Sequence, residues 1–144
     1  MRFTVFSLLF VALFGMLVSA DAPEPPRELE IQTVYLPPDC PRKSTNGDVL
    51  KVHYTGKLFS NGNKFDSSYD RNTPFSVTLG RGQVIRGWEQ GLQGMCEGEK
   101  RTLIIPSHLA YGNRAMGSKI PANSALEFDV ELLELDARGK RDEL

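Results

Sequence analysis

Two long segments of this chain, residues 48–58 and 125–135, alternate apolar and polar side chains with a period of two. In the first segment Leu50, Val52 and Tyr54 fall on one face, and lysine, histidine and threonine fall on the other. Such alternation is typical of antiparallel strands that place one face on a core and the other in water. The strongest pattern in the sequence therefore predicts a sheet that is covered on one side.

Shorter segments extend this sheet. They are rich in β-branched or alternating residues and end at prolines, glycines or polar turns: residues 28–35, 64–66, 74–79 and 100–105. In the first of them Leu29, Ile31 and Thr33 alternate with Glu28, Glu30 and Gln32, which predicts a strand. Residues 67–73 are interpreted as a polar loop.

Helical spacing is confined to one short stretch. Val84, Trp88 and Leu92 recur every four residues, although Gly87 and Gly91 weaken an isolated helix. With nine prolines and 13 glycines in 144 residues, strands and tight turns are favoured over long helices. The expected fold class is α+β, with a twisted antiparallel sheet of about five strands and one short helix on its apolar face.

The composition indicates a single globular domain and excludes several classes of protein. Hydrophobic residues make up 40% of the chain and charged residues 24%. The 17 basic and 18 acidic residues give a net charge of −1 without a basic stripe, which argues against nucleic-acid binding. His53 and His108 are isolated and Cys40 and Cys96 are far apart, so we expect no metal site.

The N-terminus has the pattern of a secretory signal peptide. Arg2 supplies a positive charge, residues 3–18 are almost wholly apolar, and Val18-Ser19-Ala20 is a small-x-small exit. A membrane anchor is the alternative, but a run of about 16 residues is short for a span of roughly 20. We expect residues 1–20 to be removed and residues 21–27 to form a disordered mature start.

The C-terminus predicts the compartment. Residues 141–144 read Arg141, Asp142, Glu143 and Leu144, which differs from the retrieval signal Lys-Asp-Glu-Leu only by arginine for lysine. A receptor reads such a signal, so it must be exposed, and residues 137–144 have the polar character of a solvated tail. The two ends together predict residence in the lumen of the endoplasmic reticulum (ER), with the folded domain over residues 28–136.

That compartment affects the interpretation of Cys40 and Cys96. They form no Cys-x-x-Cys motif, so a disulfide oxidoreductase is disfavoured. In an oxidising lumen a distant pair is most simply a structural disulfide, worth roughly 4 kcal/mol in the chain-entropy model for such a loop. Two free buried thiols remain the alternative at this point.

Catalytic chemistry based on a nucleophile or base has little support. His53 lies on the polar face of its strand and is interpreted as a solvated surface histidine, and His108 lies in an expected turn. Aromatic residues, in contrast, occur in nearly every expected element, and Phe65-Asp66 places a ring and a carboxylate at the edge of a polar loop. Pockets for small apolar ligands combine aromatic walls with a few polar groups.

Six motifs in order resemble the FKBP immunophilins, and within them the small ER-lumenal branch. The resemblance covers residues 48–135, essentially the whole expected domain. Its motifs are Val52-His53-Tyr54-Thr55-Gly56, Phe65-Asp66-Ser67-Ser68, Gly82-Gln83-Val84-Ile85-Arg86-Gly87-Trp88, Leu109-Ala110-Tyr111-Gly112, Ile120-Pro121 and Phe128-Asp129-Val130-Glu131-Leu132-Leu133.

The resemblance implies a peptidyl-prolyl cis-trans isomerase with a half-open antiparallel sheet wrapped around one short helix. Implied partners are proline-containing polypeptides, macrolides such as tacrolimus and rapamycin, and the retrieval receptor. The implied protein is a monomer without cofactor or metal. In the ER-lumenal branch a cysteine pair matches Cys40 and Cys96, which favours the disulfide. Tyr69, Met116 and Glu127 depart from the common pattern of the family.

The resemblance also implies a site, residue by residue. Trp88 is expected to form its floor, Tyr111 and the backbone N–H of Ile85 to donate hydrogen bonds to a substrate carbonyl, and Asp66 to orient the ligand. The catalytic set is Tyr54, Phe65, Asp66, Trp88, Tyr111 and Phe128. The substrate and macrolide set is Tyr54, Phe65, Asp66, Arg71, Phe75, Gln83, Val84, Ile85, Trp88, Tyr111, Ile120 and Phe128. The same pocket also suits a pure binding module, in which turnover is incidental.

Overall fold

The computed structural model describes residue 15 and residues 21–137. The leader, apart from Gly15, and the retrieval tetrapeptide at residues 141–144 therefore lie outside the described residues. The described residues form six strands: β1 (Glu30–Tyr35), β2 (Val49–Leu58), β3 (Lys64–Ser67), β4 (Phe75–Thr78), β5 (Lys100–Ile105) and β6 (Leu126–Asp136). They also form α1 (Arg86–Gly91) and two 3₁₀ turns, η1 (Ser68–Arg71) and η2 (Ser107–Leu109).

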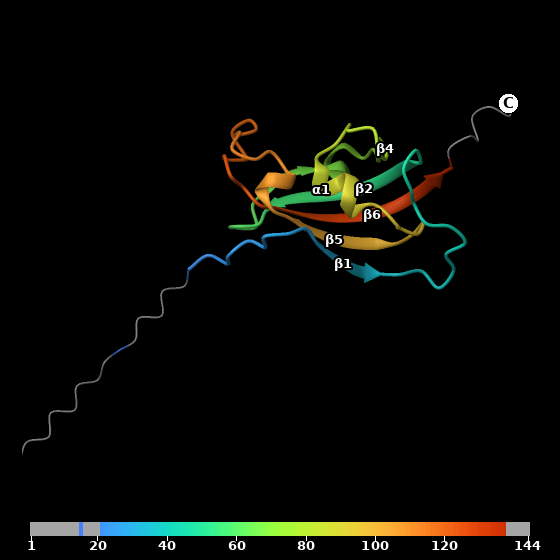
Figure 1. Cartoon of the computed structure of the whole chain (residues 1–144), viewed down its shortest axis with the longest axis horizontal. Coiled ribbons are helices and arrows are strands. Elements are labelled where there is room, and N and C mark those ends of the chain that lie inside the picture. The colour runs from blue at the N-terminus through green and yellow to red at the C-terminus, as the bar shows by residue number, and fades with distance from the viewer. Residues whose placement is uncertain (1–14, 16–20, 138–144) are drawn as a thin grey trace, which may run out of the picture.

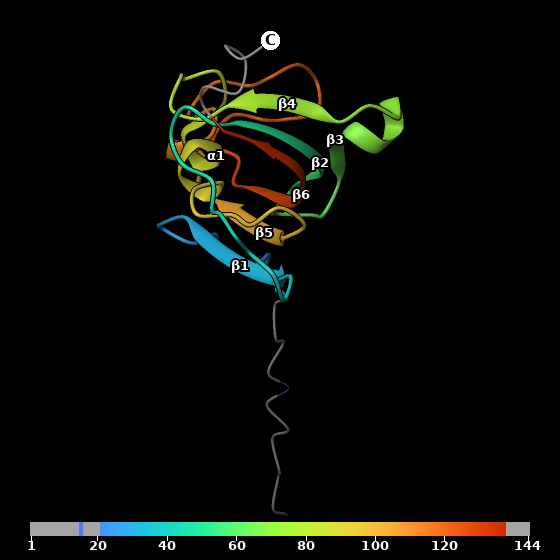
Figure 2. The same cartoon turned by 90° about the vertical axis from the view of Figure 1, so that its right-hand side faces the viewer.

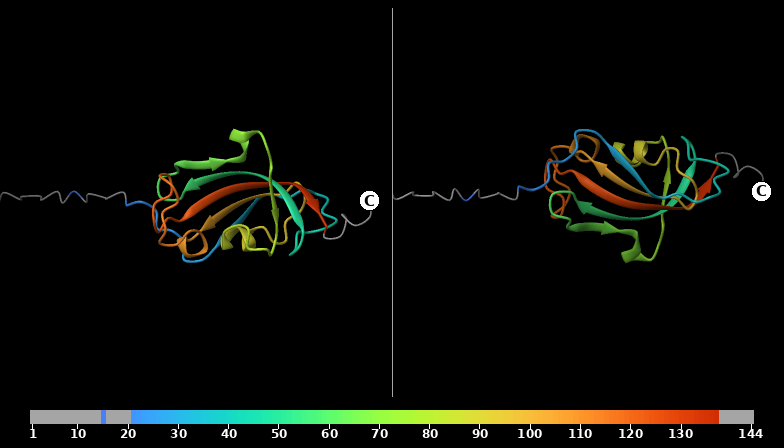
Figure 3. Two further views of the ribbon diagram at one scale, coloured as in Figure 1. Left: turned by 90° about the horizontal axis from the view of Figure 1, so that it is seen from above. Right: turned by 90° about the horizontal axis from the view of Figure 1, so that it is seen from below.

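The six strands make one antiparallel sheet in the order β1-β5-β6-β2-β3, and β4 also pairs with β2 (Figure 1). β2 and β6 lie at its centre and pair along their whole lengths, with Tyr54 opposite Val130 and Gly56 opposite Phe128. β2 alternates strictly between half-buried and buried residues, as predicted from its sequence. The strands twist strongly relative to one another (Figure 3), and the predicted α+β fold is confirmed.

The helix α1 packs against one face of the sheet, and its two glycines explain how it approaches so closely (Figure 2). A Cβ atom at Gly87 would lie 2.4 Å from Cγ2 of Ile105, and one at Gly91 would lie 2.7 Å from Cδ1 of Leu103. The glycines that weaken the isolated helix therefore allow its backbone to rest directly on β5.

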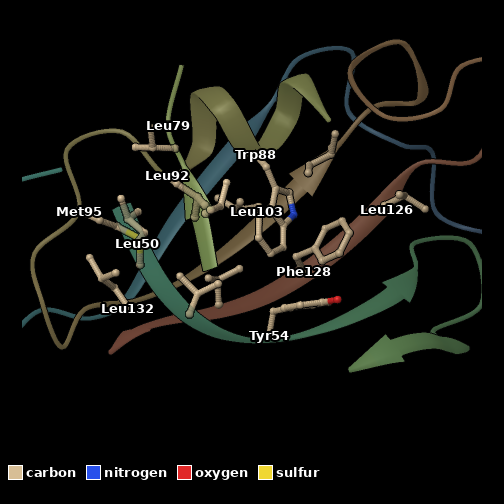
Figure 4. Packing of buried hydrophobic residues seen from close by; sticks show 14 of the residues in the cluster. Leu50, Tyr54, Leu79, Trp88, Leu92, Met95, Leu103, Leu126, Phe128 and Leu132 are labelled. Carbon is tan, nitrogen blue, oxygen red and sulfur yellow. The ribbon is translucent and has the colours of Figure 1, made fainter. Parts of the chain in front are cut away.

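The core between α1 and the sheet has two ends of different chemistry (Figure 4). At one end aliphatic side chains fill the space completely; they include Leu50, Leu79, Leu92, Met95 and Leu132, all fully buried. At the other end Tyr54, Trp88 and Phe128 meet ring against ring. The aliphatic end therefore holds the fold together, and the aromatic end borders the functional site.

β1 forms within the strand predicted for residues 28–35, but its alternation does not lead to burial. All six residues of β1 are exposed, and Leu29, just before the strand, is half-buried against the core. β1 is an edge strand with β5 as its one partner among the described residues, so α1 does not cover it. The expected loop at residues 67–73 contains η1, because Ser68 is fully buried and anchors a tight turn.

His53 is also less solvated than expected. It is half-buried, its Nδ1 lies 2.7 Å from Oγ of Ser68, and its ring stacks on Tyr69 with centroids 4.3 Å apart. The backbone N–H of Tyr54 donates to the same serine oxygen over 2.8 Å. His53 thus belongs to the anchor of η1 and is not a free surface group.

The structure contains the disulfide Cys40–Cys96, with Cα atoms 5.5 Å apart. It joins the connector after β1 to the loop that precedes β5, 56 residues later. Within residues 21–137 we find no helix that is long and apolar enough to cross a membrane.

Candidate functional site

A cavity of about 420 Å³ opens at the aromatic end of the core, between α1 and the sheet. Its lining comes from separate parts of the chain, so only folding brings these side chains together. The lining residues are Tyr54, Phe65, Asp66, Phe75, Gln83, Val84, Ile85, Trp88, Tyr111 and Phe128. The structure therefore gathers ten of the twelve residues that the sequence suggested for the site.

The other two lie next to this cavity. Arg71 contacts Asp66 from η1, with Nη1 2.5 Å from Oδ1. Ile120 lines a neighbouring cavity of about 410 Å³, which shares Phe65, Asp66 and Tyr111 with the first. The two cavities are thus adjacent, and the loop that carries Ile120 lies beside Tyr111.

The floor of the first cavity is the indole of Trp88, which is only 4% exposed. It stands edge-to-face against three other rings, with centroid distances of 5.0 Å to Tyr54, 5.3 Å to Phe128 and 6.0 Å to Phe75. Edge-to-face pairs are the favoured aromatic geometry and fix ring orientation. No described residue accepts a hydrogen bond from its Nε1. The floor and walls are therefore rigid and largely apolar.

Gly56, to which the motifs assign no part in the site, makes this ring arrangement possible. A Cβ atom at Gly56 would lie 2.6 Å from Cζ of Phe65 and 2.8 Å from Cε1 of Phe128. Any larger residue in the centre of β2 would push these rings apart. The sequence did contain a sign of this role, because Gly56 interrupts the most regular strand pattern of the chain. A glycine inside a strand weakens it, and it often marks a place where another group approaches the backbone closely.

Asp66 is the charged group at the cavity edge, and its two partners hold it in place. The hydroxyl of Tyr54 donates to Oδ2, and Arg71 donates to Oδ1 and, over 3.0 Å, to the Tyr54 oxygen. Partial burial acts to raise the pKa of Asp66, but these hydrogen bonds and the arginine charge outweigh it and lower the pKa. Burial and the bond to Asp66 raise the pKa of Tyr54. The carboxylate is therefore ionised and the phenol neutral at neutral pH.

Two hydrogen-bond donors that belong to lining residues have no partner among the described residues. Ile85 precedes α1 in an extended conformation, and its carbonyl accepts from Trp88 and Glu89 while its N–H finds no acceptor in the described chain. The hydroxyl of Tyr111, likewise in the lining, has no described acceptor. The site thus offers two donors for a carbonyl group of a bound molecule.

Neither His53 nor His108 lines the cavity, and the described residues contain no cluster of three metal-ligating side chains. An aromatic cavity with one fixed carboxylate and a few donors suits a reaction that needs shape and low polarity.

Comparison with known proteins decides the family. Residues 40–133 match the model of the FKBP-type peptidyl-prolyl cis-trans isomerase domain. This chain is an FKBP-type peptidyl-prolyl cis-trans isomerase. It is 53% identical to FK506-binding protein 2 of Dictyostelium discoideum over 90% of this chain and 94% of that protein. It is 50% identical to the peptidyl-prolyl cis-trans isomerase FKBP2 of Homo sapiens, over 94% of each chain.

Other FKBP-type proteins extend the comparison. FK506-binding protein 2B of Rhizopus delemar is 55% identical over 90% of this chain, which spans 64% of that longer protein. The crystal structure of AtFKBP13 superposes with a TM-score of 0.67 and 40% identity, over 76% of this chain and 93% of that chain. Sequence and fold therefore agree on the FKBP family, and the chain is an isomerase of X-Pro bonds.

Proposed function

We propose that this isomerase accelerates X-Pro isomerisation during the folding of secretory proteins in the ER lumen. The leader at residues 1–20 and the tail at residues 141–144 support that address, and the disulfide Cys40–Cys96 suits an oxidising compartment. Uncatalysed X-Pro isomerisation takes tens to hundreds of seconds and limits the folding of many chains.

The observation that carries the proposed mechanism is the apolar cavity over Trp88. Rotation about an X-Pro bond crosses a barrier of about 18–20 kcal/mol that amide resonance sets. The twisted transition state has less double-bond character and a less polar carbonyl than the planar amide. An apolar, water-poor cavity shaped for the twisted form binds it more tightly than the planar form, and this difference is catalysis.

Specific residues take specific parts in this mechanism. The proline ring rests on Trp88, between walls formed by Tyr54, Phe75 and Phe128. The N–H of Ile85 and the hydroxyl of Tyr111 donate to carbonyl groups of the substrate. Asp66, held by Arg71, orients the bound chain and transfers no proton. Phe65, Gln83, Val84 and Ile120 complete the contact surface.

We further propose that the same cavity binds macrolides such as tacrolimus and rapamycin. The names of the relatives, FK506-binding proteins, support this proposal. The test is an isomerisation assay on purified residues 21–144 with and without tacrolimus. We expect activity that tacrolimus abolishes; binding without measurable turnover would instead make the cavity a pure recognition site.

Trp88→Ala provides the most direct test of the floor. Removing a buried aromatic ring is expected to weaken macrolide binding by about 3 kcal/mol or more. Calorimetric titration measures this loss, and Tyr35→Ala, which removes an exposed ring from β1, serves as control with unchanged affinity. Full affinity in a folded Trp88→Ala variant would remove Trp88 from the site.

The compartment is tested separately. Deletion of residues 141–144 is expected to release the protein into the medium of expressing cells, with isomerase activity unchanged. Complete intracellular retention of the truncated chain would contradict the proposed retrieval signal.

A further inference from the structure

The large apolar side chains that the described residues expose fall into two groups. Phe75 lines the catalytic cavity and Met116 lines its neighbour. The other five are Ile31, Val34, Tyr35, Leu36 and Tyr69. Of these, Tyr69 lies in η1, whereas Ile31, Val34 and Tyr35 lie in β1 and Leu36 directly follows it. In the sheet β5 separates β1 from β6 and β2, the central strands that border the catalytic cavity.

β1 is the edge of the sheet, and its outer side is free in the described chain. It pairs with β5 alone, and no other described segment forms backbone hydrogen bonds with it. In Figure 2 β1 lies beyond β5, on the side opposite β3 and β4. Proteins normally protect such an edge with lysine, inward-pointing charges or proline, because unpaired N–H and C=O groups attract another strand.

Here the protection is slight. Residues 30–35 contain neither lysine nor proline, and a register shift after Thr33 leaves Val34 as the most exposed residue of the group, at 66%. Ile31, Tyr35 and Leu36 are 46%, 50% and 59% exposed. The bulge and the prolines at 37 and 38 limit the available edge to about six residues, without blocking it.

The charged residues of this edge lie at its N-terminal end, where the acidic ones are in excess. Glu28 and Glu30 stand at its beginning, after Arg27, so this end carries two acidic groups and one basic group; neither glutamate has an ion pair among the described residues, and the apolar side chains stand at the other end. A strand added antiparallel would place its own C-terminal half beside the two glutamates and its N-terminal half beside Tyr35 and Leu36. A second copy of this chain would set glutamates against apolar side chains, which is a poor match.

We propose that β1 is a docking edge for an extended segment of another polypeptide, which joins the sheet as an antiparallel seventh strand. The segment has apolar residues in its N-terminal half and lysine or arginine in its C-terminal half. Backbone hydrogen bonds give such binding its affinity, and the charge pattern gives it a direction. Because β1 lies away from the cavity, this segment and an X-Pro substrate bind at the same time. The inference does not depend on the proposed macrolide binding or compartment.

The probe is a blocked peptide without proline, Thr-Val-Tyr-Ile-Thr-Lys-Thr-Lys, with residues 21–144 of the chain. We expect binding that saturating tacrolimus leaves unchanged, and protection of β1 amides from hydrogen exchange. The same residues in reverse order, and a version with glutamate for both lysines, are the matched controls and are expected to bind more weakly. Equal binding of the reversed peptide, competition by tacrolimus, or protection elsewhere would overturn the proposal.

Two variants complete the test. Val34→Lys is expected to abolish binding of the lysine peptide while isomerase activity, which also reports folding, stays unchanged. Glu30→Lys is expected to weaken that peptide about two- to fivefold, the scale of one cross-strand charge pair, and to strengthen the glutamate version correspondingly. Unaltered binding in folded Val34→Lys would contradict the docking edge. Self-association of the native chain that Val34→Lys abolishes would show that the occupant is a second copy and would refute this assignment.

Discussion

Arg101 and Arg71 each pair with a carboxylate, yet the two pairs have different surroundings. The side chains of Glu99 and Arg101 are 2% and 10% exposed, whereas those of Asp66 and Arg71 are 40% and 51% exposed. Arg101 also donates to the carbonyls of Gly91, Gln93 and Gly94 over 2.7–2.9 Å. The buried arginine thus satisfies the carbonyl of Gly91, the last residue of α1, and those of two residues that follow the helix.

Burial separates two uses of the same chemistry. All the acceptors that Arg101 contacts are groups of the folded chain, namely Glu99 and three backbone carbonyls. Glu99 in turn accepts a hydrogen bond from the Cys96 N–H over 3.1 Å. Around Arg71 the carboxylate lines a cavity and is 40% exposed, so a ligand can reach it. The first pair is a structural support of α1, and the second is able to respond to what binds.

The largest contrast is expected in stability. Arg101→Ala leaves Glu99 as an unpaired buried charge and several carbonyls without donors, which costs about 3–5 kcal/mol of unfolding free energy. Arg71→Ala is expected to cost about 0–1 kcal/mol, as is typical of exposed pairs. Urea denaturation of both variants measures the two losses, and equal losses would contradict the distinction between a structural and a responsive pair.

The disulfide extends the structural side of this comparison, because Cys96 also donates to Glu99. Replacing both cysteines with serine is expected to lower the unfolding free energy by about 2–5 kcal/mol. Since neither cysteine lines the cavity, kcat/KM is expected to stay unchanged under conditions where the variant is folded. A parallel loss of activity in the folded variant would show that this region supports the cavity after all.

Asp66→Asn tests the functional side. The amide keeps the shape and one acceptor oxygen but removes the charge, so macrolide affinity is expected to fall by about 1.5–3 kcal/mol at most. The isomerisation rate is expected to fall less than the roughly 10²–10⁴-fold that is typical of a lost general acid or base. A loss of about a thousandfold, accompanied by a carboxylate titration in the pH–rate profile, would favour acid–base catalysis instead.

The smallest effect is expected from pH. Despite its partial burial, the bonds from Tyr54 and Arg71 lower the pKa of Asp66 below its unfolded value of about 3.9. The stability from this pair is complete above that value and is lost only as the pH falls through the lower folded pKa. Activity is therefore expected to stay nearly flat from about pH 5 to 8, which rate measurements across that range check.

The strands with regular alternation, and the family, could be predicted from the amino-acid sequence. β2 and β6 carry a period of two along most of their length, because one face of each meets the core. The residues of the cavity were identified from motifs, since each aromatic residue alone looks like ordinary core. Their assembly around Trp88 needed the fold, because they come from distant segments.

Features that depend on the approach of distant segments followed only from the tertiary structure. Gly56, Gly87 and Gly91 look unfavourable in a strand or helix, and their reason is the ring or strand that packs against each backbone. β1 shows the opposite case: its sequence alternates, but its place at the edge leaves every side chain exposed. Local pattern states which residues prefer burial, whereas burial itself depends on which neighbours the fold supplies.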